Sequence, residues 1–569
     1  MTIDTTYLDA DADYVKPARL AINDMADWIN ESGLATVTQY GAIGDGLTDC
    51  LTAFQTALAA ADRIIVPAGS YRIPFTLGSS LAPAAGQVLE GDGADNTTIT
   101  LVVPSTAYFA CINPSGNGIV FRNLKILLEV PAGGSAVMLI GDVSGVTFEN
   151  CDIDGAVTNS GASISHEAYL VNFPSSGTQT DYAVRGCDVH RFTFPVLKAN
   201  ASTSAQSRLS FEHCDFFGNY YEDLSFNSPN GSMDDVQVYM CRFRDGSGAS
   251  ASLSQIYVAF ASVTNFRVGG CSFSGAIGVG GAAVHLEENC VGGAITGNTM
   301  HVQGYGVSMN GNDRASGGAI TQPSHITVVG NTIRKYGAQG ESGSFGIACI
   351  HNPDLDPAAK NIIVANNGIT GYATGIYSVL TLDDSSLIRG NHVENCTVGM
   401  DFKDGSCTVS GNTTANCTTG VKGSASTATT DSAAIDDHTF INCTTNVDAT
   451  ELPVTLFNPR FIFAEFDHAG GSTSVYKLCA PMGANDRLHG FLEINVDSDN
   501  SSSYSRQRDE VTWDGTTFTK ADKFAIEPGA IATNAANNSS ALAVQVFSSA
   551  ARTGVRVQAK LNGMAVVAV

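Results

Sequence analysis

The chain has 569 residues, 15% of them charged, and its 59 glycines and 43% hydrophobic residues are typical of a β-rich folded protein rather than a disordered one. Its formal net charge of −25 excludes nucleic acid and anionic membranes as favoured partners, because both carry dense negative charge. No stretch of 18 apolar residues is present and the N-terminus is acidic, so we expect neither membrane insertion nor an export signal.

Residues 1–33 form the first segment of the chain. They include the run YVKPARLAINDMADWINES, whose apolar residues recur at helical spacing. We therefore predict a short helical segment that is distinct from the sequence after it.

A glycine-rich stretch, YGAIGDGLTD (40–49), leads into an apolar run. Leu51, Phe54 and Leu58 share one face at helical spacing, and Thr48 or Asp49 can cap the N-terminus of such a helix. We predict a helix that covers the exposed edge of a β structure, since open sheet edges pair with other chains.

Between residues 119 and 445 one short phrase recurs every 21–36 residues, as in FENCDI, FEHCDF, VVGNTI and IRGNHV. A repeat of this length, built from alternating β-type residues with Gly and Asn between them, is typical of a β-solenoid. Because neighbouring coils stack about 4.8 Å apart, we predict an inward ladder of reduced thiols and amides rather than disulfides. The ladder positions are Cys151, Cys187, Cys214, Cys241 and Cys271, then Asn298, Asn331, Asn367, Asn391 and Asn412, then Cys443.

The segment after each phrase predicts a second stacked sheet, whose residues point alternately inward and outward. From residue 451 the ladder is lost and the pattern becomes that of antiparallel strands. We therefore predict an all-β chain: a helical segment (1–33), a parallel β-helix (34–450) and a C-terminal sandwich-like or jelly-roll domain (451–569). The inward residues of the second sheet align as Leu224, Ile256, Val284, Val307, Ile347, Ile376 and Met400.

Residues 37–73, VTQYGAIGDGLTDCLTAFQTALAAADRIIVPAGSYRI, resemble the opening segment of the pectate-lyase-like superfamily, as found in bacteriophage tailspikes and in secreted polysaccharide-degrading enzymes. With the coil pattern, the resemblance covers about residues 34–450, and it implies a right-handed parallel β-helix. The matching elements are Tyr40-Gly41-Ala42, Gly44-Asp45-Gly46, Thr48-Asp49, the helix around Phe54 and Gln55, and Pro67-Ala68-Gly69-Ser70-Tyr71.

Among the branches of this superfamily, the resemblance favours a tailspike. It implies a homotrimer on a virion that acts outside the host cell and that binds and cleaves a bacterial surface polysaccharide: a capsule, an O-antigen or an exopolysaccharide. The same resemblance implies that the C-terminal domain fixes the trimer or binds carbohydrate. Residues 1–33 would then dock onto a phage tail or adaptor protein.

Glycoside hydrolysis needs two carboxyl groups that flank the scissile bond. The outward positions of the middle coils are locally polar, and Glu287 is the first candidate for a general acid or base. His285 lies on the same face, where it can tune the pKa of Glu287. Asp223, two coils earlier, and Asp313, on the following loop, are the candidates for the partner carboxyl.

Further residues around this face are candidates for substrate binding. Aromatic rings present flat apolar surface to a pyranose, and an arginine can clamp an acidic sugar. The acidic loops HNPDLD and TLDD lack the regular spacing of a calcium site, and no other cofactor motif is convincing, so we predict no metal and no cofactor. The substrate-binding candidates are Tyr221, Glu222, Tyr257, Tyr305, Asn310 and Arg314.

Two alternatives to hydrolysis stay open at this point, besides a purely structural virion or surface-layer spike that binds no glycan. The first is a polysaccharide lyase on the same fold, with Tyr257 or His285 as the base and Arg314 neutralising a uronate. The second is a spike that binds the glycan without cleaving it.

Overall fold

The computed structural model describes residues 33–567 except for a set of internal segments. These segments are 159–163, 174–176, 197–204, 228–231, 245–254, 311–320, 351–359, 379–384, 403–406, 425–432, 449–453, 463–465, 469–471, 478–486, 498–503, 514–517, 527–530, 539–540 and 549–551. The predicted helix within residues 1–33 thus lies outside the described residues, except for its last position. The chain divides into two units, Met1–Ser272 and Phe273–Val569.

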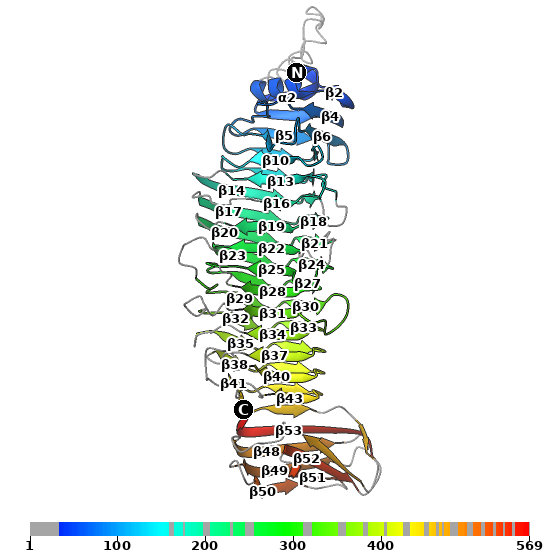
Figure 1. The fold of residues 1–569 in the computed structure, drawn as a ribbon, viewed down its shortest axis with the longest axis vertical. Helices are drawn as coiled ribbons and strands as arrows, with labels where there is room; N and C mark the ends of the chain where they lie inside the picture. Colours follow the sequence, from blue (N-terminus) through cyan, green and yellow to red (C-terminus); the bar gives the residue numbers. More distant parts are fainter. Residues whose placement is uncertain are drawn as a thin grey trace, which may run out of the picture. The chain divides into compact units, whose positions relative to one another are not determined.

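The first unit is a stack of coils, and each complete coil contributes one strand to each of three parallel columns, here named A, B and C (Figure 1). Column A contains β1 (Leu34–Thr36), β3 (Arg63–Val66), β5 (Val88–Gly91), β8 (Val120–Arg122), β11 (Thr147–Glu149), β14 (Thr178–Arg185), β17 (Ala205–Glu212), β20 (Ser232–Tyr239) and β23 (Val263–Gly269). Column B contains β2 (Asp45–Asp49), β4 (Gly69–Pro74), β6 (Thr97–Val102), β9 (Lys125–Glu129), β12 (Asp152–Asp154), β15 (Asp188–His190), β18 (Asp215–Phe217) and β21 (Arg242–Arg244). Column C contains β7 (Phe109–Ile112), β10 (Ser135–Ile140), β13 (Glu167–Asn172), β16 (Phe194–Val196), β19 (Glu222–Asn227) and β22 (Ile256–Ala261).

The second unit repeats the same three-strand coil, and β24 (Ser272–Gly275) spans the division between the units. Its column A contains β26 (Ala294–Thr296), β29 (Thr327–Val329), β32 (Ile363–Ala365), β35 (Leu387–Arg389), β38 (Thr408–Ser410), β41 (Ala433–Asp436) and β44 (Val454–Phe457). Its column B contains β27 (Thr299–Val302), β30 (Thr332–Lys335), β33 (Gly368–Thr370), β36 (His392–Glu394), β39 (Thr413–Ala415), β42 (Thr439–Ile441) and β45 (Arg460–Ile462). Its column C contains β25 (Ala282–Leu286), β28 (Tyr305–Asn310), β31 (Phe345–Ile350), β34 (Thr374–Ser378), β37 (Val398–Phe402), β40 (Thr419–Gly423) and β43 (Thr445–Asp448). The predicted parallel β-helix is therefore confirmed.

The glycine-rich stretch opens the first unit as predicted. Its first residue, Tyr40, ends the 3-10 turn η1 (Val37–Tyr40), its last five residues form β2, and the helix α2 (Leu51–Ala60) comes next. Phe54 of α2 is buried edge-on against Tyr71, with ring centroids 5.8 Å apart. Asp49 Oδ1 accepts a hydrogen bond from the backbone N–H of Leu51 (2.9 Å), so this aspartate satisfies an otherwise free donor of the first helical turn. Leu51 itself is half-buried rather than part of the buried face.

The ladder column is inward in both units. In the first unit each thiol packs against the coil before it, and Cys214 Sγ lies 3.2 Å from Val184 O. In the second unit the amides form a chain: Asn331 Nδ2 donates to Asn367 Oδ1 (2.9 Å), and Asn367 Nδ2 donates to Asn391 Oδ1 (3.0 Å). All thirteen cysteines within the described ranges are free thiols, as the ladder interpretation predicts.

The predicted alignment of the second sheet holds in one unit and is wrong in the other. In the second unit Val307 pairs with Ile347, as expected. In the first unit, however, Leu224 pairs with Val258, whereas Ile256 pairs with Glu222. The predicted register of β22 was therefore displaced by two residues, a shift that leaves the inward–outward pattern unchanged.

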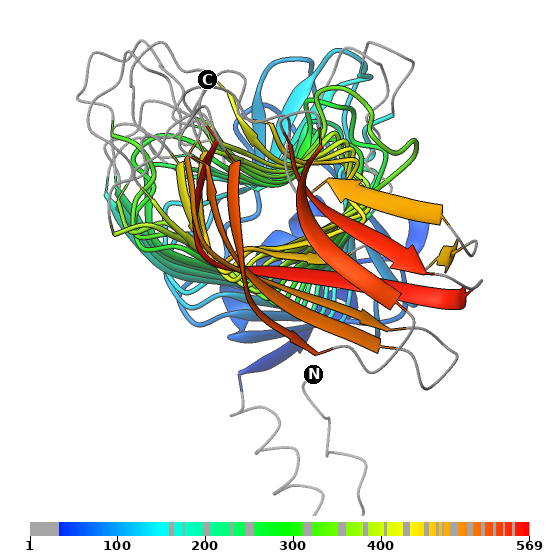
Figure 2. The same ribbon diagram turned by 90° about the horizontal axis from the view of Figure 1, so that it is seen from below.

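The C-terminal strands of the second unit are antiparallel, as predicted, and Figure 2 shows them in orange to red. The long strand β53 (Arg552–Val567) pairs with β44 and β45 of the last coil, with β46 (Phe466–His468) and with β48 (Arg487–Asp497). The sheet continues from β48 through β49 (Tyr504–Trp513) to β50 (Phe518–Ile526). A second sheet consists of β47 (Ser472–Lys477), β52 (Ala541–Ser548) and β51 (Ile531–Asn538). Among the described residues, no helix has the length and apolarity that a membrane span requires.

Candidate functional site

The second unit brings two predicted catalytic residues together at the end of β25. Val284 and Leu286 point into the core and have no exposed surface, so His285 and Glu287 project from the opposite face. His285 Nε2 lies 3.5 Å from Glu287 Oε1, and the two side chains are only 11% and 13% exposed. This partial enclosure strengthens the electrostatic interaction between the carboxyl group and the imidazole, because little water screens it.

Aromatic rings follow one another on this part of column C. Tyr305, a predicted substrate-binding residue, stacks on Phe345 with ring centroids 5.2 Å apart and an interplanar angle of 16°. The Phe345 ring in turn lies 4.9 Å from that of Tyr377. The three half-buried rings come from β28, β31 and β34 and form a row, here called the aromatic row. Such rings provide an apolar surface against which a pyranose can stack.

Strand pairing connects the His285–Glu287 pair to the strand that bears the first ring of this row. His285 pairs with Ser308 of β28, and Tyr305 and Asn310 are the two end residues of that strand. Asn310 is half-buried. The structure therefore brings four predicted site residues onto or directly after two adjacent strands: His285, Glu287, Tyr305 and Asn310. Asn310 shares the outward register of His285 and Ser308, whereas Tyr305 has the register of the inward Val307 and lies half-buried at the start of its strand.

Three residues of this region were not predicted from the sequence. Tyr377 was missed because the neighbouring outward residues, such as Ala348 and Ile350, are bland. Phe345 was missed because it has the inward register of Ile347 and is half-buried only at the start of its strand. Phe345 pairs with Tyr305, and Tyr377 pairs with Ala348, so the alignment of neighbouring coils is what identifies both residues. Glu288 was missed although it follows Glu287 directly, and it is almost fully buried.

Asp223 does not occupy the accessible position that the sequence predicted. It lies in the first unit on β19, and its side chain is 0% exposed. Asn219 Nδ2 donates to Asp223 Oδ1 (2.9 Å). Burial raises the pKa of Asp223 to about 8, and the negative charge of Asp215 adds to this shift. The accessible position that the sequence predicted for this carboxyl group is therefore wrong, and the structure offers no contact between Asp223 and a bound glycan.

Tyr257 is also enclosed, with no exposed surface, and its ring centroid lies 6.0 Å from that of Phe243. It therefore offers no face to a sugar and no accessible base. Tyr221 is half-buried and makes an edge-on contact with Tyr220 (4.6 Å between centroids), and Glu222 begins β19 opposite Ile256. Both lie in the first unit. Asp313 and Arg314 fall in the segment 311–320, outside the described residues.

A row of three aspartates on column B of the first unit was not anticipated. Asp152, Asp188 and Asp215 pair with one another across β12, β15 and β18. Each follows a ladder cysteine directly, so the recurring Cys-Asp dipeptide was the signal. Burial raises the pKa of Asp188, and the charges of Asp215 and Asp152 act in the same direction.

Basic side chains on the same column pair with most of this row. His190 Nε2 and Lys125 Nζ each lie 2.7 Å from the carboxylate of Asp152, and they hold its pKa below the usual value against the effect of burial. Arg244 Nη2 lies 3.0 Å from Asp215 Oδ2. We therefore interpret the row as a charge network that holds neighbouring coils in register. Within the described ranges, no cluster of His, Cys, Asp or Glu has a geometry that would hold a metal ion.

Comparisons with known proteins bear on the fold alone. No protein-family model and no curated protein matches the sequence. Solved structures are similar at low identity, among them the A-module of mannuronan C-5 epimerase AlgE4 from Azotobacter vinelandii (14% identity, TM-score 0.43, covering 68% of this chain and 96% of that one). The tailspike gp61 of Pseudomonas phage phi297 is 12% identical, with a TM-score of 0.36 over 94% of this chain and 99% of that one. The tailspike gp49 of Acinetobacter baumannii bacteriophage Fri1, described as a capsular polysaccharide depolymerase, is 12% identical, with a TM-score of 0.34 over 94% and 86%.

Proposed function

We propose that this protein binds a bacterial surface polysaccharide and cleaves it by glycoside hydrolysis on column C of the second unit. The observation that carries the proposal is the His285–Glu287 pair, which is nearly enclosed and lies one strand from Tyr305 of the aromatic row. A carboxyl group provides the acid–base chemistry, and the rings provide the stacking surface that a sugar chain needs.

Glu287 is the proposed general acid or base. His285 is the proposed neighbour that tunes Glu287, since its Nε2 lies 3.5 Å from Glu287 Oε1. The partner carboxyl that hydrolysis requires remains the sequence prediction Asp313, three positions after Asn310 in the chain. Arg314 remains a predicted substrate clamp. We do not assign this role to Asp223, because its side chain is buried.

The biological setting follows from the resemblance of residues 37–73 to tailspikes. We propose a homotrimer on a phage tail that acts on capsule, O-antigen or exopolysaccharide outside the host cell. Residues 1–33 are the proposed attachment segment, and the antiparallel strands after β45 are the proposed trimerisation or carbohydrate-binding part.

The test is the rate at which reducing ends are released from purified polysaccharides of a panel of bacterial strains. We expect Glu287→Gln to lower this rate by about 10² to 10⁴-fold, the usual contribution of acid–base catalysis. Glu394→Gln is a matched control, because His392 and Glu394 have the same sequence spacing and a similar separation (3.5 Å) but are 50% and 37% exposed on column B. Equal rates for wild type and Glu287→Gln would reject the site.

The same assay separates the alternatives. A lyase would generate an unsaturated uronide. New ultraviolet absorbance in the products would therefore indicate that the protein cleaves by elimination rather than by hydrolysis. The enclosure of Tyr257 leaves His285 as the only one of the two sequence-predicted bases with exposed surface. Binding of a polysaccharide without release of any fragment would make the protein a non-catalytic spike.

A further inference from the structure

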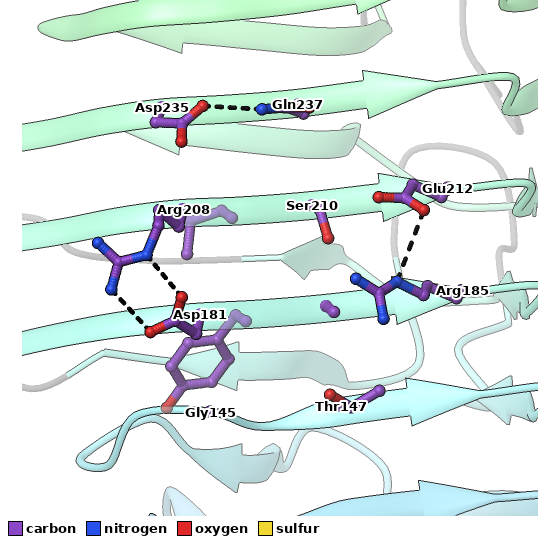
Figure 3. A pocket seen from close by; sticks show the side chains of 12 residues that line it. Gly145, Thr147, Asp181, Arg185, Arg208, Ser210, Glu212, Asp235 and Gln237 are labelled. Carbon is purple, nitrogen blue, oxygen red and sulfur yellow. Dashed lines mark hydrogen bonds and ion pairs between the residues drawn. The ribbon is translucent and has the colours of Figure 1, made fainter. Parts of the chain in front are cut away.

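A hollow of about 420 Å³ lies on the outward face of column A in the first unit, well apart in sequence from the proposed catalytic residues (Figure 3). Four successive strands, β11, β14, β17 and β20, form it. Its size is within the range of small-ligand sites. Its charged and amide side chains are Asp181, Arg185, Arg208, Glu212, Asp235 and Gln237.

Strand register gives the hollow a floor and two walls. Thr147, Ala183 and Ser210 pair in one row across β11, β14 and β17, and their small side chains form the floor. Arg185 and Glu212 pair in the row on one side. On the other side a residue in the left-handed conformation recurs in each coil, and the recurring residues are Asp181 (φ 64°), Arg208 (φ 54°) and Asp235 (φ 55°). Figure 3 shows Ser210 between the two charged walls.

The wall side chains hold one another in place. Arg208 donates from Nε to Asp181 Oδ1 (2.6 Å) and from Nη2 to Asp181 Oδ2 (2.8 Å). These bonds, together with one from Thr180, lower the pKa of Asp181 to about 2, so this carboxylate remains ionised. On the opposite wall Arg185 Nε lies 3.5 Å from Glu212 Oε2. Side chains fixed in this way lose little entropy when they bind a ligand.

The walls also have hydrogen-bond donors and acceptors that a ligand can use. A guanidinium has five N–H donors, and Asp181 takes only two of those of Arg208, whose side chain is 55% exposed. Donors and carboxylate acceptors thus lie side by side, an arrangement that suits neighbouring sugar hydroxyl groups. The lining holds three carboxylates against two guanidinium groups, a balance that does not attract a polyanion.

An exposed ring borders this lining. Tyr239 pairs with Glu212 across β17 and β20, lies two residues beyond Gln237 on the same face, and is 50% exposed. Its apolar face is available to a pyranose at the edge of the hollow.

We propose that this hollow is a second glycan-binding site, which takes an uncharged segment of the polysaccharide that the protein cleaves. The inference rests on the proposed polysaccharide ligand but concerns a different surface. A long polymer bound at both places is held more tightly than at either alone, because the second contact forms within an already bound chain.

The test is a binding measurement on immobilised capsule and O-chain polysaccharides of known repeat, half of them uncharged and half with a uronic acid in every repeat. All proteins carry Glu287→Gln, so that the polymers stay intact. Ser210→Trp fills the floor of the hollow without removing a charge. Ser410→Trp, at a half-buried outward serine of β38 on column A of the second unit, is the matched control.

We expect Ser210→Trp to weaken binding of an uncharged polymer by about tenfold or more, and Ser410→Trp to leave it unchanged. Tyr239→Ala, an exposed substitution that does not disturb the core, should also weaken binding.

Equal binding by Ser210→Trp and Ser410→Trp of a polymer that the wild type cleaves would overturn this inference and leave the proposed function intact. If the wild type neither binds nor cleaves any polymer, both proposals fail. A change of native mass with Ser210→Trp would identify the hollow as a subunit contact instead, and preferential binding of the uronic polymers would refute the uncharged ligand.

Discussion

Asp223 is a carboxyl group inside the first unit with an incomplete set of hydrogen bonds. Its Oδ1 accepts from Asn219, whereas its Oδ2 has no hydrogen-bond partner within the described part of the chain. A buried charge without a partner is costly, which is why the neutral acid is favoured and the pKa rises to about 8.

This shift predicts how stability changes with pH. The pKa is about 3.8 in the unfolded chain and about 8 in the folded one, so between these values the folded state binds one proton more. The free energy of unfolding therefore falls as pH rises through this window. Asp223→Asn keeps the acceptor for Asn219 and removes the titration.

We expect Asp223→Asn to raise the free energy of unfolding by about 2 to 5 kcal/mol at pH 8 and far less at pH 4.5. Chemical denaturation at both pH values measures the difference, with wild type as the reference. A gain that is the same at both pH values would show that Asp223 does not titrate in this window.

The two His-x-Glu pairs show what a sequence can and cannot predict about a site. His285–Glu287 and His392–Glu394 are identical in spacing and have similar separations, but the first pair is nearly enclosed and the second is exposed. The sequence predicted the first pair because polar outward residues cluster around it. It could not predict the burial of Asp223 or Tyr257, because alternation fixes the direction of a side chain and not what covers it.

At the scale of elements, the two halves of the ladder differ in their hydrogen bonds, which are strong between the asparagines and weak at the cysteines. Asn367 accepts from the backbone N–H and the side-chain amide of Asn331, and it donates to Val328 O (2.9 Å) and to Asn391. The thiol of Cys214 makes only weak contacts with carbonyl oxygens. Its position depends on packing more than on hydrogen bonding.

Substitutions at these two positions should therefore differ in cost. Asn367→Ala leaves several buried groups without partners and should lower the free energy of unfolding by about 3 to 6 kcal/mol, whereas Cys214→Ala should lower it by about 1 kcal/mol. Denaturant midpoints of the two variants, measured side by side, provide the comparison. Similar losses would show that both halves are held by packing alone.

A column of glycines on column C of the second unit was not predicted at all. A Cβ atom at Gly346 would lie 2.3 Å from Ile369 Cγ2, and one at Gly375 would lie 2.2 Å from Val393 Cγ1. These residues let the sheet approach column B closely. Glycines are so frequent in this chain that their spacing gave no signal.

The two-residue error in β22 has a related cause. Inward and outward residues alternate with a period of two, so the sequence pattern fits equally well at either register. The pairing of Leu224 with Val258 depends on contacts with the neighbouring coils, and those contacts are not visible in the pattern of one strand. The repeat thus predicted the solenoid and its ladder, but not the register of every coil.

At the scale of the whole molecule, the proposed homotrimer is directly testable. Light scattering on a sizing column should give three times the chain mass of 59.2 kDa if the trimer that the resemblance of residues 37–73 implies is correct. Deletion of the residues after Ile462 should abolish the trimer if the antiparallel strands fix it. A native mass of one chain would contradict the tailspike interpretation while leaving the fold unchanged.

The amide ladder also bears on how fast backbone N–H groups of the second unit exchange their protons with solvent. The backbone N–H of Asn331 donates to Asn367 Oδ1, and the backbone N–H of Asn367 donates to Asn391 Oδ1, so each main-chain donor is bound to a side chain of the next coil. One coil cannot open without breaking a bond that belongs to its neighbour. We therefore expect these N–H groups to exchange with deuterium more slowly than those of the thiol ladder, where the backbone N–H of Cys151 reaches only the sulfur of Cys187 (3.4 Å).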